Sequence, residues 1–294
     1  MAAIRWLVGL MLLVTTPALG QDTNLAFPGG RGILTVEGPT GLFINPTSGT
    51  PPQGLFTAQV CAAAFETPAP DPTSIVGTRM LLTYAVTDWL ELGPHFFKVQ
   101  NNGEGPAYGP MIRVRALPDR SGTAVPEIAF GYYADEWNTL SGEPKRVLFS
   151  AVSKGIEVPG EGFVRSIRFH GGARHTWDDA ASEETEGVVY GGLEVELPKW
   201  VYLVGEVSSE DEQKGTETPY SLGVHVRHPS GVGVSLGAFQ HGGAEDLAMF
   251  IGVGIGLRPA PAPRPAPAPR DEEEEEEDED DRQGTRSRSA AWRF

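Results

Sequence analysis

Apolar and polar side chains alternate along twelve short stretches between Leu55 and Arg258. Alternation of this kind places successive side chains on opposite faces of a strand. A closed antiparallel sheet in a bilayer uses it many times in succession. The pattern therefore predicts an all-β protein, namely a transmembrane antiparallel up-and-down β-barrel of about 12 strands between residues 55 and 258.

The length of each stretch agrees with this prediction, because a tilted strand needs ~9–11 residues to cross the hydrocarbon. Tight, turn-like connectors alternate with connectors that are mostly longer and rich in charge or glycine, which is the asymmetry that outer-membrane barrels show. The predicted strands are residues 55–65, 78–86, 89–99, 107–117, 124–133, 146–154, 163–174, 187–196, 200–207, 219–227, 232–241 and 247–257.

Residues 1–20 have the features of a secretory signal peptide. Arg5 precedes an apolar run from Trp6 to Val14, and the small residues Ala18 and Gly20 fit cleavage before Gln21. The alternative is an uncleaved anchor. The mature chain contains one cysteine, Cys61, so an internal disulfide is excluded.

Residues 21–54 are rich in Gly, Pro, Thr and Asn. We expect this N-terminal periplasmic segment or plug to form ordered coil or a brief strand beneath or inside the barrel, and a disordered leader is the alternative. An even strand count would also return the C-terminus to the periplasm.

Two segments follow the barrel. In residues 259–270 Pro alternates with Ala or Arg, and this segment is expected to extend as a Pro/Ala-rich polyproline linker. Residues 271–294 begin with eleven consecutive acids, Asp271 to Asp281, and are predicted to be a disordered acidic tail. That run carries most of the net charge of −16, and no basic patch supports nucleic-acid binding. A basic periplasmic partner or divalent cations are the expected partners of the tail.

Charge sorting predicts which face of each strand meets lipid. Arginine at the midplane of the lipid face costs ~2–4 kcal/mol, so the greasier face is assigned to lipid, with Met80, Tyr84 and Leu222 as examples. The opposite face is expected to carry a lumen charge network. Its members are Arg79, Glu91, Arg113, Arg115, Glu127, Arg168, Glu194, Glu196, Glu206 and Arg227.

The same sorting assigns other polar residues to the lumen, namely Arg146, Lys154, Arg258, His95, His170 and His225. Glu91 is expected to pair with Arg113 or Arg115 across neighbouring strands. The cluster of Glu194, Glu196 and Glu206 requires cationic partners, for which Arg168 and Arg227 are the candidates. These charges either fill a narrow lumen with salt bridges or line a passage for a charged or sugar-like solute.

No catalytic, metal or cofactor site is predicted. The histidine spacing matches no metal motif. A lipid-hydrolysing barrel would place Ser and His together on its outer rim, and charge sorting places no such pair there.

Several short motifs resemble those of known barrels. The segment from Tyr84 to Gly93, with its Thr87-Asp88 turn, is similar to hairpins of many Gram-negative outer-membrane barrels. The segment from Gly38 to Thr50 resembles the leader of the exopolysaccharide-associated outer-membrane barrel family, as do Gly191–Val195 and Leu203–Val207. This resemblance implies an integral outer-membrane protein linked to surface polysaccharide.

The leading hypothesis is an outer-membrane barrel in contact with lipid, with an envelope structural role or a role in the passage of polar solutes. The second hypothesis is a secreted soluble β-sandwich that acts as a binding module. The third is an outer-membrane lipid-modifying enzyme.

Overall fold

The structure is a computed structural model that describes residue 35 and residues 41–66, 74–100, 105–120, 123–138, 144–160, 162–178, 186–209, 218–240 and 247–257. All of these belong to one of the chain's two compact units, Met1–Pro259. The expectations for the signal peptide, for Arg258, and for the linker and tail at residues 259–294 lie outside the described residues. Among the described residues, no helix is long and apolar enough to cross a membrane.

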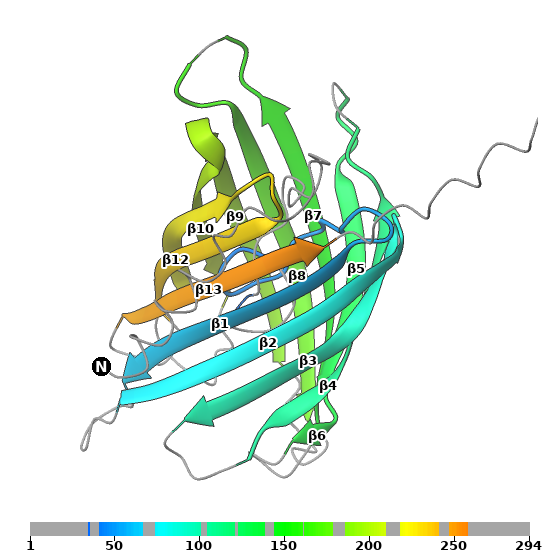
Figure 1. The fold of residues 1–294 in the computed structure, drawn as a ribbon, viewed down its shortest axis with the longest axis vertical. Helices are drawn as coiled ribbons and strands as arrows, with labels where there is room; N and C mark the ends of the chain where they lie inside the picture. The colour runs from blue at the N-terminus through cyan, green and yellow to red at the C-terminus, as the bar shows by residue number, and fades with distance from the viewer. Residues whose placement is uncertain are drawn as a thin grey trace, which may run out of the picture. The chain divides into compact units, whose positions relative to one another are not determined.

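One antiparallel sheet makes up most of the described structure (Figure 1). Its strands are β1 (Phe56–Glu66), β2 (Ser74–Thr87), β3 (Leu90–Gln100), β4 (Ala107–Leu117), β5 (Glu127–Asp135), β6 (Trp137–Asn138), β7 (Lys145–Glu157), β8 (Ser166–Asp178), β9 (Glu186–Leu197), β10 (Val201–Ser208), β11 (Tyr220–Arg227), β12 (Val232–Gln240) and β13 (Ala248–Leu257).

The sheet closes on itself. Each long strand pairs with the next one along the chain, and β13 pairs back onto β1, with Val253 opposite Val60. The two-residue strand β6 continues β5 beyond a bend at Glu136 and pairs with β4. The result is a closed barrel of twelve long antiparallel strands, as the alternation predicts, and the alternative of two stacked sheets in a β-sandwich is wrong.

The two ends of the barrel differ. Short turns close one end, at Asp88–Trp89 and at the 3-10 turn η1 (Pro198–Trp200), where Lys199 and Trp200 have positive φ angles of 60° and 64°. This end is called the short-turn end below. The strand ends that border the longer connectors form the other end, which is called the long-connector end below.

Burial alternates along the strands, and apolar side chains dominate the exposed positions. In β2, Met80, Leu82 and Tyr84 are exposed, whereas Leu81 and Thr83 between them are buried. In β11, Leu222 is 68% exposed, while His225 is fully buried. The wall is therefore apolar outside and polar inside, which is the reverse of a water-soluble protein and the arrangement of a transmembrane barrel.

Exposed aromatic side chains gather near the strand ends. Tyr108 stacks on Trp137 near the long-connector end, with ring centroids 5.3 Å apart. At the short-turn end, Trp200 meets His228 edge to face at 4.5 Å, and Trp89 is exposed beside its turn. These positions match the interfacial aromatic belts of membrane barrels.

Candidate functional site in the barrel lumen

The inward faces of the strands carry most of the charges assigned to the lumen. Arg113 and Arg227 are among the largest fully buried side chains, and Arg115, Arg168 and Glu196 are partly buried. Their positions follow from strand alternation, since inward residues recur at every second position. The buried members of the network are Arg79, Glu91, Arg113, Glu127, Glu194, Glu206 and Arg227.

A first ion pair joins neighbouring strands β3 and β4. Arg113 Nη1 lies 3.6 Å from Glu91 Oε2, with both side chains fully buried, and the Thr83 hydroxyl donates to Glu91 Oε1 at 2.5 Å. The Arg113 guanidinium also lies 5.7 Å from the centre of the Phe149 ring. Of the two partners expected for Glu91, the structure selects Arg113.

A second group lies nearer the short-turn end. Arg115 Nη1 lies 3.4 Å from Glu127 Oε1, and Arg168 Nη1 lies 3.4 Å from Asp119 Oδ2 and 3.9 Å from Glu127 Oε2. Arg168 therefore pairs with Asp119, which follows β4, and with Glu127 of β5. It does not pair with the cluster of Glu194, Glu196 and Glu206. Asp119, in the turn after β4, is a partner that charge sorting missed because it does not lie in a strand.

Arg227 and Glu194 form a two-pronged ion pair. Arg227 Nη1 donates to Glu194 Oε1 at 2.9 Å, and Nη2 donates to Oε2. The guanidinium also stacks over the Tyr202 ring, 4.3 Å from its centre. Glu196 instead accepts a hydrogen bond of 2.7 Å from the Ser166 hydroxyl.

Glu206 differs from the expectation, because its partners are neutral. Its carboxylate accepts the backbone N–H groups of Phe43 at 2.8 Å, Ile44 at 2.5 Å and Asn45 at 3.1 Å. The Asn45 side-chain amide at 3.2 Å and the Ser221 hydroxyl at 2.7 Å also donate to it. Successive backbone N–H groups that converge in this way form an anion-binding nest, so one carboxylate of the wall binds residues 43–45 of the N-terminal segment.

The segment that Glu206 holds lies inside the barrel. Residues 41–50 are all buried, and a bridge between Gly41 and Pro46, with Leu42 N–H donating to the Asn45 carbonyl at 3.0 Å, folds the start of the segment into a tight loop. We call residues 41–50 the lumen loop. Its sequence lies within the segment for which a position beneath or inside the barrel was expected.

Phe43 of the lumen loop fills a socket in the wall. Its ring stacks on His225 with centroids 4.8 Å apart and meets Phe250 edge to face at 5.4 Å. A Cβ added at Gly223 or Gly237 would come within 2.5–2.8 Å of the ring. Glycine at these two inward positions therefore creates the space that the ring occupies, and we call this space the Phe43 socket.

Further bonds attach the lumen loop toward the short-turn end. The Ser48 hydroxyl donates to Glu127 at 3.0 Å, and Arg113 donates to the Gly49 carbonyl at 2.5 Å. Beyond these, Gln53 N–H donates to the Asp88 carboxylate at 2.8 Å. The lumen loop is thus connected to several members of the predicted charge network at once.

Two residues assigned to the lumen are placed differently. Arg146 follows the outward alternation of β7 and pairs with Glu136 at 3.0 Å near the strand end. Lys154 shares the outward alternation of Val152 and Ile156, and its Nζ lies 2.6 Å from Asp119 Oδ1. Both lie near strand ends, where a long side chain can reach a polar partner without crossing the apolar belt.

The three inward histidines make hydrogen bonds. His95 Nε2 bonds the Ala134 carbonyl at 2.8 Å, His170 Nδ1 bonds the Ser153 hydroxyl at 2.8 Å, and His225 Nδ1 bonds Ser235. The Ser–His neighbours arise from cross-strand register that the sequence does not show, and both serines are buried rather than on the outer rim. Within the described ranges, no group of three or more His, Cys, Asp or Glu is arranged to hold a metal.

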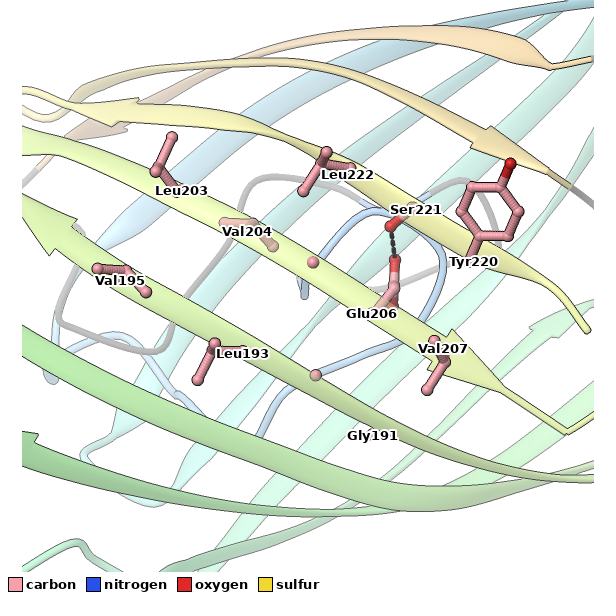
Figure 2. A pocket seen from close by; sticks show the side chains of 12 residues that line it. Gly191, Leu193, Val195, Leu203, Val204, Glu206, Val207, Tyr220, Ser221 and Leu222 are labelled. Atoms are coloured by element: carbon pink, nitrogen blue, oxygen red, sulfur yellow. Dashed lines mark hydrogen bonds between the residues drawn. The ribbon is translucent and has the colours of Figure 1, made fainter.

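Two hollows lie in this part of the wall. A polar cavity of about 610 Å³ near the short-turn end is lined by Asp119, Lys154, Arg168, Glu194 and Tyr202, among others. A groove of about 650 Å³ runs over the outer surface of β9–β11, where Leu203 and Leu222 are exposed (Figure 2). Figure 2 also shows the bond between Ser221 and Glu206.

Comparison with known proteins gives structural similarity without sequence similarity. No protein-family model matches the chain, and no curated protein matches it. An outer membrane channel from Pseudomonas putida F1 is 12% identical over 73% of this chain and 100% of that chain, with a TM-score of 0.46. Two mutants of the porin of Rhodopseudomonas blastica are 13% and 12% identical over 69% of this chain and 99% of theirs, each with a TM-score of 0.30. At these TM-scores the barrel assignment rests on the strand pairing described above.

Proposed function

We propose that this protein is an integral outer-membrane β-barrel whose lumen passes small polar solutes and is closed by the lumen loop. One observation supports the proposal most directly: a closed ring of strands exposes apolar side chains outside and buries charged side chains inside. Closed barrels of this kind satisfy all backbone hydrogen bonds without water, as the bilayer core demands. The signal peptide expected from the sequence supports export to the outer membrane.

A second role, purely structural, is supported by the pairing within the lumen. Arg113 with Glu91, and Arg227 with Glu194, neutralise each other, and the lumen loop fills space between the walls. On this alternative the charges hold the barrel together and nothing passes. The link to surface polysaccharide is a further proposal, and it rests only on the resemblance of the short motifs.

Membrane fractionation and bilayer recording test the proposal in two steps. The protein is expected in the outer-membrane fraction, and on a denaturing gel its unheated and heated forms are expected to migrate differently. Purified protein in planar bilayers is then expected to give current steps that increase when the lumen loop is weakened. Protein that remains in the aqueous phase without detergent contradicts the membrane location, and folded protein without current in any variant leaves the structural role.

For the C-terminal tail, we propose binding to divalent cations or to a basic periplasmic partner, because Asp271 to Asp281 concentrate negative charge in one run. Calcium titration measures whether the full chain binds more calcium than a form that ends at residue 258 and therefore has no tail. Equal binding by both forms rejects a role for the tail.

The lipid-modifying alternative is tested by replacing His170 and His225, since retained hydrolase activity would exclude them as the catalytic base.

A further inference from the structure

We propose that the lumen loop occupies a binding site for organic cations, and that release of the loop exposes this site to solutes that carry a flat ring close to an ammonium group. The inference deepens the proposed function and rests on it, because the solute must reach the lumen from one end. The site consists of the Glu206 carboxylate and the Phe43 socket.

The charge of the site comes from Glu206. In the closed state five neutral donors satisfy this buried carboxylate, and four of them belong to the lumen loop. No ion pair joins Glu206 to a Lys or Arg among the described residues, and the nearby Arg227 and Arg113 bind Glu194 and Glu91. When the loop leaves, only Ser221 remains as a donor. A carboxylate that has lost four of its five donors is stabilised by a cation that takes their place.

The shape of the site comes from the Phe43 socket. The His225 and Phe250 rings and the space at Gly223 and Gly237 accept a flat ring without rearrangement of the wall. In Phe43 itself the nitrogen that donates to Glu206 and the ring that fills the socket are joined through Cα and Cβ. This is the skeleton of a phenethylammonium ion, so the loop residue has the form of the ligand class that we infer.

The polar cavity near the short-turn end lies on the same strands as the site, and we infer that a solute enters from there once the loop has left. The polar cavity of about 610 Å³ near the short-turn end is lined by Glu194 of β9 and Tyr202 of β10. The neighbouring inward positions on β10 are Val204 and Glu206, which lies beside the lumen loop. The cavity is lined by four acids, Asp119, Glu157, Glu194 and Glu196, and by two bases, Lys154 and Arg168, and this excess of acid attracts cations toward the opening.

Calorimetry of the full chain in detergent tests the inference, with phenethylammonium chloride as the probe and sodium phenylacetate as the ring-matched anion. The Phe43→Ala variant removes the ring that anchors the lumen loop in the socket and leaves the wall unchanged, so the ammonium group of the probe can displace the loop from Glu206. It is expected to bind phenethylammonium and not phenylacetate. The Phe43→Ala/Glu206→Gln double variant is expected to bind about tenfold or more weakly, because a hydrogen bond to a charged group is lost.

A second loop variant keeps the inference testable if Phe43→Ala does not fold. Ile44→Pro removes one N–H donor to Glu206 without changing the wall, and it is expected to increase binding of phenethylammonium relative to the unmodified chain. Heat-dependent gel migration verifies that each variant is folded. Equal binding of cation and anion, or binding that is unchanged by Glu206→Gln, overturns the inference, as does the absence of binding by both folded loop variants.

Bilayer recording separates this inference from the proposed function. If the loop variants bind phenethylammonium but carry no current, the site exists and the proposal of solute passage is wrong. If they carry current without preference for phenethylammonium over sodium and without binding, solute passage stands and the cation site is rejected.

Discussion

Arg227 and Glu194 illustrate how single residues depend on each other inside this wall. Both are nearly inaccessible, and the guanidinium meets both carboxylate oxygens while it stacks on Tyr202. Two charges removed from water together are tolerated because each neutralises the other, but either one alone would be left without compensation.

We therefore predict that Arg227→Met destabilises the barrel by ~3–5 kcal/mol, because Glu194 is left buried and unpaired. The double variant Arg227→Met/Glu194→Leu is expected to recover most of this loss. The measurement is the free energy of unfolding in urea from lipid vesicles. A double variant that is no more stable than Arg227→Met would contradict the assignment of the loss to unpaired charge.

The glycines of the Phe43 socket matter because they have no side chain, which leaves room for the Phe43 ring. Gly223 and Gly237 lie on β11 and β12 at inward positions where any Cβ would meet the Phe43 ring. The fit between the lumen loop and the wall therefore depends on residues that have no side chain.

Among the elements, the turn after β4 depends on one carboxylate. Asp119 accepts hydrogen bonds from Lys154 Nζ at 2.6 Å and from the Gly155 N–H at 3.2 Å. Burial by itself raises the pKa of Asp119, but these hydrogen bonds and the charges of Arg168 and Lys154 outweigh it and lower the pKa below its ordinary value. The turn is thereby joined to β7 and β8.

This depressed pKa predicts how the turn responds to acid. A carboxyl group whose pKa is lower in the folded state contributes stability above its unfolded pKa, and that stability is lost as pH falls through the folded value. Protease cleavage within residues 118–126 is therefore expected to rise on acidification. Asp119→Asn is expected to raise cleavage already at neutral pH and to remove most of the acid response. An acid response that is unchanged in Asp119→Asn would assign it to another group.

Strand β2 provides a test of the lipid-facing surface. Met80, near its centre, is 43% exposed, and Val86, beside the turn, is 38% exposed. In a bilayer, Met80→Arg is expected to cost ~2–4 kcal/mol and Val86→Arg ~0–1 kcal/mol, because the cost depends on depth. Unfolding from vesicles by guanidinium measures both. Equal effects at the two positions would contradict a β2 that crosses the hydrocarbon.

At the scale of the whole molecule, the seam between β13 and β1 closes the barrel. Residues from Phe56 to Ala64 pair with residues from Leu257 to Met249, although nearly the whole barrel sequence separates the two strands. Closure removes both sheet edges, which would otherwise expose unpaired backbone groups to lipid.

Val253, which pairs with Val60 on one side and Val234 on the other, tests this closure. Val253→Pro removes a backbone donor from the middle of the last strand. We expect loss of the heat-dependent change in gel migration and accumulation of unfolded protein. Val253→Ala, which keeps the donor, is expected to retain the migration change. A folded, heat-modifiable proline variant would show that the seam is not required.

The sequence by itself determined the strands and their faces, because the side-chain period of a strand is local and the cost of charge in lipid applies at each position. Predicted and observed strands therefore agree closely, as for residues 107–117, which form β4. Arg146 and Lys154 were misplaced because this cost is small near strand ends, where either face permits a long charged side chain.

Only the tertiary structure decided which inward residues meet. Strand register brings Arg113 to Glu91 and His170 to Ser153. A contact between distant parts of the chain brings the lumen loop to Glu206. Residues 43 and 206 are 163 positions apart, and no local pattern relates them. The side-chain period shows which way each residue points, whereas its partner is fixed by the register of the neighbouring strands and by the loop that enters the lumen.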